Sequence, residues 1–299
     1  MSYTNNQAVF GLLNIAGQAM ENVFSVKWYA AIGTHKDGFF FLLGCAIAYC
    51  LSFTSMLIFL AWWYPYHECP RWLLTRNHLW WYLKIGVTNA LNGIFIIFAA
   101  DGSRTPGVLQ QCIFFCGVPL TIVCNIFELG ENPRRYMAAQ PLFAIGLVLG
   151  GAILGTLVPS FHGYTSGHPA WIAIFVVGSF FGALYNVQQK AFLDWHAAWQ
   201  VEQKIQLPHT FVYVHLLAGQ CGVMLLFFAC CYWVDLLPWF GFASSLEEMA
   251  KHSEILSLSF LPWRWGEVNQ SGLLFCLFNI GYLVSFVCAL GMNHFSTSW

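Results

Sequence analysis

The stretch from Gly38 to Trp63 reads GFFFLLGCAIAYCLSFTSMLIFLAWW and contains no acidic or basic side chain. A helix of about 20 such residues is long enough to cross the hydrocarbon core of a bilayer. Because the bilayer offers no water to unpaired backbone groups, a spanning segment must be a helix or belong to a closed barrel. The sequence lacks the alternation of a barrel strand, so it predicts a transmembrane helix here.

The rest of the chain has the same character. Of its 299 residues, 58% are hydrophobic and 8% are charged, against roughly 45–50% and 25% in soluble domains. We expect an all-α polytopic membrane protein whose eight spans are Ala8–Ile32, Gly38–Trp63, Leu79–Ala100, Thr105–Phe127, Gln140–Val158, Ala170–Phe192, Thr210–Trp233 and Ser271–Met292. The first span carries Glu21 and Lys27, so we expect it to face protein or a cavity instead of lipid.

Two stretches resemble each other. AMENVFSVK at Ala19–Lys27 returns as ALYNVQQK at Ala183–Lys190, each at the end of an apolar run. This repeated motif divides the chain into a five-span repeat, 1–161, and a second repeat of three spans, 162–299. Because five is odd, the second copy would enter the membrane from the opposite side, as in inverted-repeat transporters. We therefore expect a ten-helix (5+5) fold whose last two helices are missing from this sequence.

Lysine and arginine in the short connections favour the cytoplasmic side. In the eight-span topology, seven of the 12 basic residues fall on the side of the amino terminus and five on the other. We predict a cytoplasmic amino terminus, and the opening residues do not have the pattern of a signal peptide.

The long connection at 235–270 begins with a helix-start pattern, in which Ser244 and Ser245 each stand three residues before a glutamate. Its apolar residues, with Trp239, Trp263 and Trp265, predict a short helix at the membrane surface. A mobile loop is the alternative. The chain's 11 cysteines lie almost entirely inside spans, where we expect them to pack as small apolar residues without binding metal.

Polar side chains inside the spans are the candidates for solute binding, because they are costly in hydrocarbon. They are Gln18, Asn22, Thr88, Asn89, Asn92, Asn186, Asn279 and Tyr282. Each is either part of a cavity wall or a hydrogen-bonded contact between helices. Uncharged amides and hydroxyls suit a zwitterionic or cationic solute. Spacings typical of membrane di-iron enzymes or intramembrane hydrolases are missing, so we expect neither an enzyme nor a cofactor.

A hairpin joins the third and fourth spans at Asp101–Gln111, DGSRTPGVLQQ. Pro106 is well placed in the first turn of the next helix. That helix start would present free N–H groups beside Arg104, Thr105 and Gln110, where an anionic group or a pivot could be held. A simple turn is the alternative.

The hairpin, and Gly117-Val118-Pro119 after it, resemble the chloroquine-resistance-transporter-like family of the drug/metabolite transporter superfamily. Further agreement lies in Asn22 before Lys27, in Leu277–Ile280 and in Phe295–Thr297. The resemblance implies a ten-helix carrier of a vacuolar, endolysosomal or plastid membrane that moves cationic drugs, amino acids, or short or thiol peptides, often with protons. Relatives carry acidic residues in the third and eighth helices, where this chain has Asn89, Asn92 and Tyr282.

We therefore expect a secondary transporter that moves small organic solutes by alternating access, with or without proton coupling. Its partners would be the solute and membrane lipid, with no nucleic acid. The alternative is a truncated membrane scaffold or receptor that transports nothing.

Overall fold

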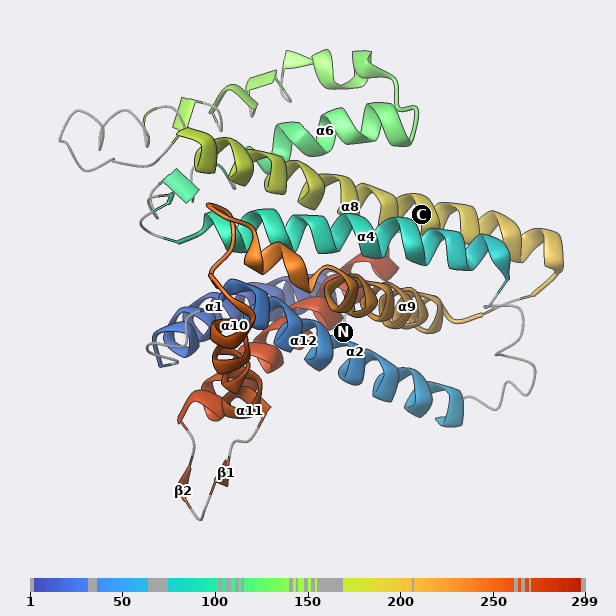
Figure 1. Ribbon diagram of the computed structural model, residues 1–299. Helices are drawn as coiled ribbons and strands as arrows, with labels where there is room; N and C mark the ends of the chain where they lie inside the picture. The colour runs from blue at the N-terminus through green and yellow to red at the C-terminus, as the bar shows by residue number, and fades with distance from the viewer. Residues whose placement is uncertain are drawn as a thin grey trace. The chain divides into compact units, whose positions relative to one another are not determined.

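The computed structural model describes most of the chain (Figure 1), namely residues 3–31, 37–63, 75–101, 104–105, 109–110, 113, 116–139, 142–143, 145–147, 150–151, 154, 169–205, 207–260, 263–264, 267–268 and 270–296. These residues are almost entirely helical. The α-helices are α1 (Tyr3–Ala31), α2 (Gly38–Trp63), α4 (Arg76–Ala99), α6 (Gly117–Glu128), α8 (Pro169–Gln203), α9 (His209–Cys230), α10 (Leu246–His252), α11 (Glu254–Phe260) and α12 (Gln270–Ser296). Short elements complete them, namely the 3-10 helices η2 (Pro133–Met137) and η3 (Tyr232–Leu236) and the antiparallel pair β1 (Trp263–Arg264) and β2 (Glu267–Val268).

Four helices, α2, α4, α8 and α9, are long and apolar enough to cross a membrane. They fall on four predicted spans, so the chain is a helical membrane protein as its composition indicates. The predicted first and last spans are also helical, in α1 and α12, and α6 covers the end of the fourth. Most of the fifth, Gln140–Val158, lies outside the described residues. The eight-span topology and the inverted repeat stay predictions.

α8 continues past the predicted end of its span at Phe192 and stops at Gln203. No glycine or proline interrupts the sequence between these positions, and His196 in this extension is buried. The helix ends where Lys204 adopts a left-handed backbone with φ 54° and the amide of Ile205 donates to the carbonyl of Gln200. This is a usual way to satisfy the last carbonyls of a helix.

The described chain forms two compact units. The first comprises residues 1–56, 208–214 and 232–299, and the second comprises 57–207 and 215–231. The predicted repeats, 1–161 and 162–299, rest on sequence similarity and stay a prediction.

In the first unit, α1 packs closely along α12 through two glycines. A Cβ on Gly17 would lie 2.5 Å from the backbone nitrogen of Ser285, and one on Gly281 would lie 2.7 Å from that of Glu21. The side chain of Asn14 donates to the carbonyl of Ser285 at 2.7 Å. Small residues of this kind let two membrane helices bring their backbones together.

In the second unit, α4 and α6 both pack on α8, and Figure 1 shows α4 running beside it. Gly178 of α8 lies against Ile96 of α4, where an added Cβ would meet that side chain at 2.9 Å. Gly219 of α9 meets Tyr82 of α4 in the same way, at 2.7 Å. Close helix packing therefore shapes this unit as well.

The segment after η3 folds into two short helices, α10 and α11, where one was expected. The predicted helix start is confirmed, because Ser245 Oγ accepts from the amide of Glu248 at 3.2 Å, and Glu248 Oε2 accepts from the amide of Ser244 at 2.8 Å. Met249 is buried, whereas Leu246 and Trp239 are 65% and 59% exposed. Attachment of this segment to the membrane surface stays a prediction.

Candidate functional site

Aromatic side chains from three helices gather in the first unit. The ring of Trp28 in α1 lies 4.7 Å, centroid to centroid, from Phe41 in α2 and from Phe275 in α12. Further along, Tyr282 stacks on Tyr49 at 4.0 Å. We call Trp28, Phe41, Tyr49, Phe275, Phe278, Asn279 and Tyr282 the aromatic site. Aromatic faces attract cations as well as apolar groups.

Two polar atoms in the aromatic site have no hydrogen-bond partner among the described residues. Asn279 donates from Nδ2 to the carbonyl of Phe275 at 2.8 Å, which leaves its buried Oδ1 open. The buried indole Nε1 of Trp28 is open as well. Burying a polar group away from water without a hydrogen-bond partner costs free energy on the order of several kcal/mol. Asn279 Oδ1 can therefore accept a hydrogen bond from a polar solute, and Trp28 Nε1 can donate one to it.

The predicted site residues of α4 and α8 contact protein. Thr88 Oγ1 donates to the carbonyl of Lys84 at 2.8 Å. Asn92 lies against Gly182, where an added Cβ would be 2.9 Å from Asn92 Oδ1, and Asn186 Nδ2 donates to the carbonyl of Gly182 at 2.9 Å. The contact of Asn92 with α8 favours a helix-packing role for it, whereas exposed Asn186 bonds within its own helix. Asn89 is half-buried.

A pair of buried amides joins α8 to α9. Gln189 Nε2 donates to Gln220 Oε1 at 3.0 Å, and both side chains are almost fully buried. Neighbouring Gln188 is also buried, and its Oε1 has no partner among the described residues. A buried acceptor without a described partner thus lies next in the chain to a satisfied amide pair.

The hairpin residues close their own turn. Arg104 Nη1 donates to the carbonyl of Phe98 at 2.7 Å, and its guanidinium carbon lies 4.1 Å from the ring centroid of Trp171. Gln110 Nε2 donates to the carbonyls of Ala100 and Thr105, each at 2.7 Å. These contacts favour the simple-turn interpretation over an anion site. Pro106 lies outside the described residues.

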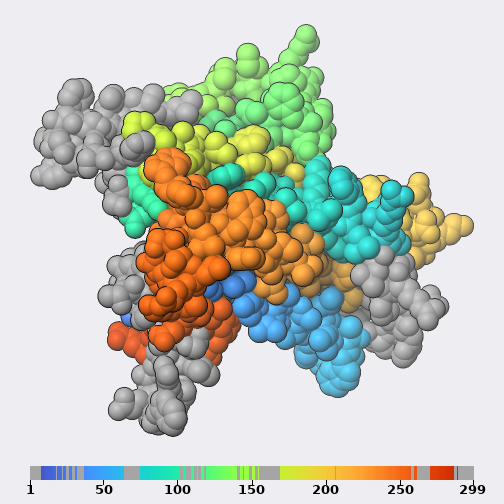
Figure 2. All heavy atoms as spheres, in the orientation of Figure 1, coloured from blue at the N-terminus to red at the C-terminus, as the bar shows by residue number. Residues whose placement is uncertain are grey.

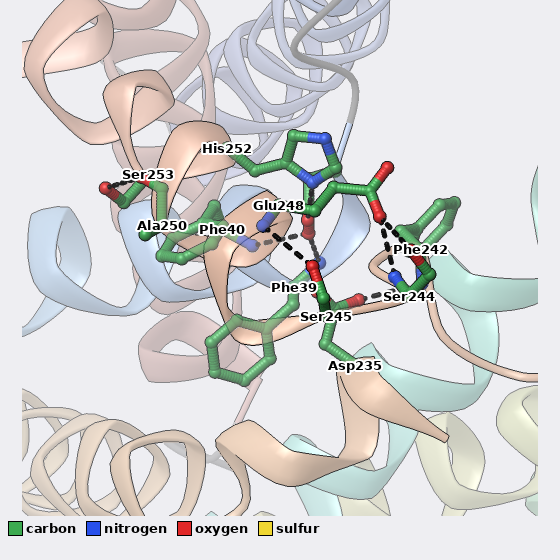
Figure 3. Close-up of polar contacts among 11 residues, drawn as sticks. Phe39, Phe40, Asp235, Phe242, Ser244, Ser245, Glu248, Ala250, His252 and Ser253 are labelled. Carbon is green, nitrogen blue, oxygen red and sulfur yellow. Dashed lines mark hydrogen bonds and ion pairs between the residues drawn. The ribbon is translucent and has the colours of Figure 1, made fainter. Parts of the chain in front are cut away.

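A cluster that the sequence analysis missed lies at the start of α2 (Figure 3). Asp37 is fully buried, and its Oδ1 accepts from the amides of Phe39 at 2.8 Å and Phe40 at 3.2 Å, so it caps the helix. Its Oδ2 accepts from Nδ1 of His252 in α10 at 2.7 Å. The cluster therefore ties α2 to the segment that follows α9.

A second carboxyl group completes this cluster. Asp235 is fully buried, and its Oδ1 accepts from the amide of Phe242 at 3.0 Å. Its Oδ2 receives no hydrogen bond from any donor in the described part of the chain. Burial first, and then the charge of neighbouring Asp37, raise the pKa of Asp235 to about 7. We call Asp37, Asp235 and His252 the carboxyl cluster.

The loop that carries Asp235 needs a glycine. A Cβ on Gly241 would overlap the carbonyl oxygen of Asp235, because the chain turns back on itself here. The amide of Ala243 donates to that carbonyl at 3.2 Å. Among the described residues, no group of three or more His, Cys, Asp and Glu side chains could hold a metal ion.

One signal in the sequence could have revealed the cluster. Asp37 directly precedes a predicted span and Asp235 stands two residues after the end of another, and the predicted topology puts both at the same face of the membrane. The side chains of Gln18 and Asn22 lie outside the described residues. A surface hollow lined by Arg76, Asn77, Leu79, Trp80 and Leu83 contains none of the predicted site residues.

Comparison with protein-family models, with curated proteins and with solved structures finds no match for this chain. Asn279 and Tyr282 both lie on α12 in the first unit. Among the described candidates of the second unit, Thr88, Asn92, Arg104, Gln110 and Asn186 contact protein, whereas the fully buried Oγ1 of Thr105 has no hydrogen-bond partner among the described residues.

Proposed function

We infer that this chain is a secondary transporter that moves small cationic or zwitterionic organic solutes across an organellar membrane by alternating access. The observation that carries this proposal is the open Oδ1 of Asn279 within the aromatic site. Cationic drugs, amino acids, and short or thiol peptides are the solute classes. The proposal also includes the location and the orientation. The family resemblance supports a vacuolar, endolysosomal or plastid membrane, and the distribution of basic residues supports a cytoplasmic amino terminus.

The chemistry of the site supports this solute class. An ammonium group over an aromatic face gains about 0.5–2 kcal/mol, depending on how far it is desolvated. A carbonyl oxygen such as Asn279 Oδ1 accepts an N–H from the same ammonium group, and Trp28 Nε1 donates to a carboxylate or carbonyl. Neither group adds a net charge, so the empty site stays compatible with the membrane.

The test separates binding from transport. Purified protein is titrated with a quaternary ammonium ion, an amino acid, a dipeptide and a thiol tripeptide, with tryptophan fluorescence as the readout. The same solutes are then offered to proteoliposomes. We expect at least one solute to bind and accumulate, and Asn279→Leu to weaken both signals about tenfold, since an amide contact to a charged group contributes about 1.5 kcal/mol.

The matched control is Asn77→Leu, which replaces an exposed amide at the start of α4. It should insert normally and leave binding and uptake unchanged. Absence of binding by every solute class in the wild-type protein would contradict the proposal and favour a scaffold or receptor.

A further inference from the structure

The carboxyl cluster has more acidic groups than basic ones. Asp37 and Asp235 are both fully buried, and His252 is their one basic partner among the described residues. Other charged groups of the neighbouring elements lie nearer the surface. Glu248 faces His252 and is held by Ser244, whereas Glu247 pairs with exposed Lys251, and Glu254 at the start of α11 is exposed. α2 adds no further acidic or basic group, and His35 and Lys36 lie outside the described residues.

The two carboxyl groups differ in how they are satisfied. Asp37 uses both oxygens, one for two amides and one for the imidazole of His252. Asp235 accepts through Oδ1 from the amide of Phe242, whereas its buried Oδ2 has no hydrogen-bond partner among the described residues, and its carboxyl group lies within hydrogen-bonding range of that of Asp37. Two acceptors that face each other without a donor repel, but one proton between them turns this contact into a hydrogen bond. A single proton bound by Asp235 therefore satisfies both carboxyl groups.

We propose that Asp37 and Asp235, with His252, form a proton-binding site that holds the 235–252 segment to the start of α2, and that the bound proton is the one that drives transport. The second half of this statement rests on the proposed function. A proton from water binds Oδ2 of ionised Asp235 and gives a neutral acid that donates to Asp37. The bond breaks when the proton returns to water, and no other reactant takes part.

This site accounts for a driving ion where the third and eighth helices offer none. In those helices, where the relatives carry acidic residues, this chain has Asn89, Asn92 and Tyr282, none of which is a carboxylic acid. The carboxyl cluster instead lies where the extramembrane segment meets a spanning helix. Loss of the proton leaves two buried negative charges against one imidazole, so the segment should separate from α2 as the pH rises.

Infrared difference spectroscopy tests proton binding directly, without any solute. Glu21→Gln serves as the background, because Glu21 is a half-buried carboxyl group in α1 that would add its own band. In this background we expect the stretch of a protonated carboxyl group to disappear as the pH rises through neutrality. Asp235→Asn should abolish the band, and Glu247→Gln, an exposed acid on α10, should leave it unchanged.

Hydrogen exchange at the amides of Phe242 and Ala243, which donate to Asp235, reports attachment of the segment. After correction for intrinsic exchange, we expect opening to increase about tenfold per pH unit between about pH 4 and the midpoint near pH 7, and to level off above it, because the closed segment keeps one proton that the open segment releases. Asp235→Asn should remove this pH dependence, because its amide N–H donates to Asp37 at every pH. If that variant fails to fold, Asp37→Asn should shift the midpoint to lower pH.

Uptake by proteoliposomes under a pH gradient completes the experiment. We expect Asp235→Asn to bind solute normally but to lose acceleration by the gradient. A missing carboxyl band, a band that survives in Asp235→Asn, or gradient-driven uptake unchanged in that variant would overturn the proposal. If the wild type shows the band and the pH-dependent exchange but moves no solute, the proposed function fails while the proton-binding site stands.

Discussion

The carboxyl cluster at the start of α2 and the ion pairs around α6 differ in their ratio of acidic to basic groups. In the second unit, Lys84 of α4 pairs with Glu128 of α6, and Lys190 of α8 pairs with Glu131 at 3.2 Å. Each cation there has one carboxylate. In the first unit, two fully buried carboxyl groups have one imidazole, among the described residues.

The difference in ratio sets how each region responds to protons. A one-to-one pair of Lys and Glu is neutral across the range from about pH 5 to 9, because both groups keep their charges. Two carboxyl groups with one histidine cannot all be charged without leaving a net negative charge in a buried place. Balanced pairs therefore suit a rigid framework, and the unbalanced cluster suits a group that binds and releases a proton.

The largest effect should come from removing Asp37. Asp37→Ala takes away the cap of α2 and the partner of His252, and we expect it to lower the free energy of unfolding by about 3 kcal/mol. Reversible denaturation in mixed micelles measures this. Asp194→Ala, which removes an exposed acid on α8, should change the free energy by less than about 0.5 kcal/mol. If both variants lost the same free energy of unfolding, the carboxyl cluster would be no more important for stability than an exposed acid, and the comparison would be contradicted.

The pH dependence of stability should have opposite signs in the two units. The pKa of Asp235 is raised from 3.8 to about 7, so the folded state binds its proton more tightly. Its contribution, on the order of a few kcal/mol after solvent screening is allowed for, is present below pH 3.8 and is lost as the pH rises through 7. Hydrogen bonds from Tyr136 and Lys190 lower the pKa of Glu131, whose contribution is lost as the pH falls below 4.5.

Hydrogen exchange at individual amides measures the pH dependence of local stability in both units within one sample. Protection of the Phe242 amide should weaken from pH 5 to pH 8, after correction for intrinsic exchange. Protection in η2, which Glu131 adjoins, should be constant over this range. A common trend in both places would contradict the comparison.

An intermediate effect is expected at Lys84. Lys84→Met leaves Glu128 without its cation, and both side chains are only 30% and 22% exposed. We expect a loss of about 1–2 kcal/mol in the free energy of unfolding. The double variant Lys84→Met/Glu128→Gln should recover most of this loss, because no unpaired charge stays behind. A double variant as unstable as the single one would show that the pair acts through packing alone.

The sequence predicted features that depend on local pattern. The limits of α2 agree with the predicted span, Gly38–Trp63, because an uninterrupted apolar run fixes both ends. The cap of α10 follows from the spacing of Ser245 and Glu248. Long-range pairs could not be predicted in this way. Asp37 and His252 are 215 positions apart, and no periodicity in either segment specifies the other.

Candidate site residues show the same limit. Composition identified the polar residues in the spans, but it could not tell a satisfied amide from an open one. Asn186 donates to its own helix, whereas Asn279 Oδ1 is open within an aromatic site that three separate helices build. That distinction depends on which helices pack together, so it needed the structure.

The smallest effect should come from the exposed pair on α10. Glu247 and Lys251 are one turn apart with side chains 82% and 71% exposed. Glu247→Gln should change the free energy of unfolding by less than about 0.5 kcal/mol, since solvent screens such pairs. Thermal unfolding in detergent measures this. A larger loss would mean that α10 depends on surface charge as well as on the carboxyl cluster.

Solute uptake by proteoliposomes with and without an imposed proton gradient tests the central claim most directly. The account predicts that the wild-type protein accumulates a cationic or zwitterionic solute, that a gradient accelerates it, and that Asn279→Leu reduces uptake while Asp235→Asn removes only the acceleration. Uptake no greater than that of protein-free liposomes, for every solute class and with or without the gradient, would contradict it.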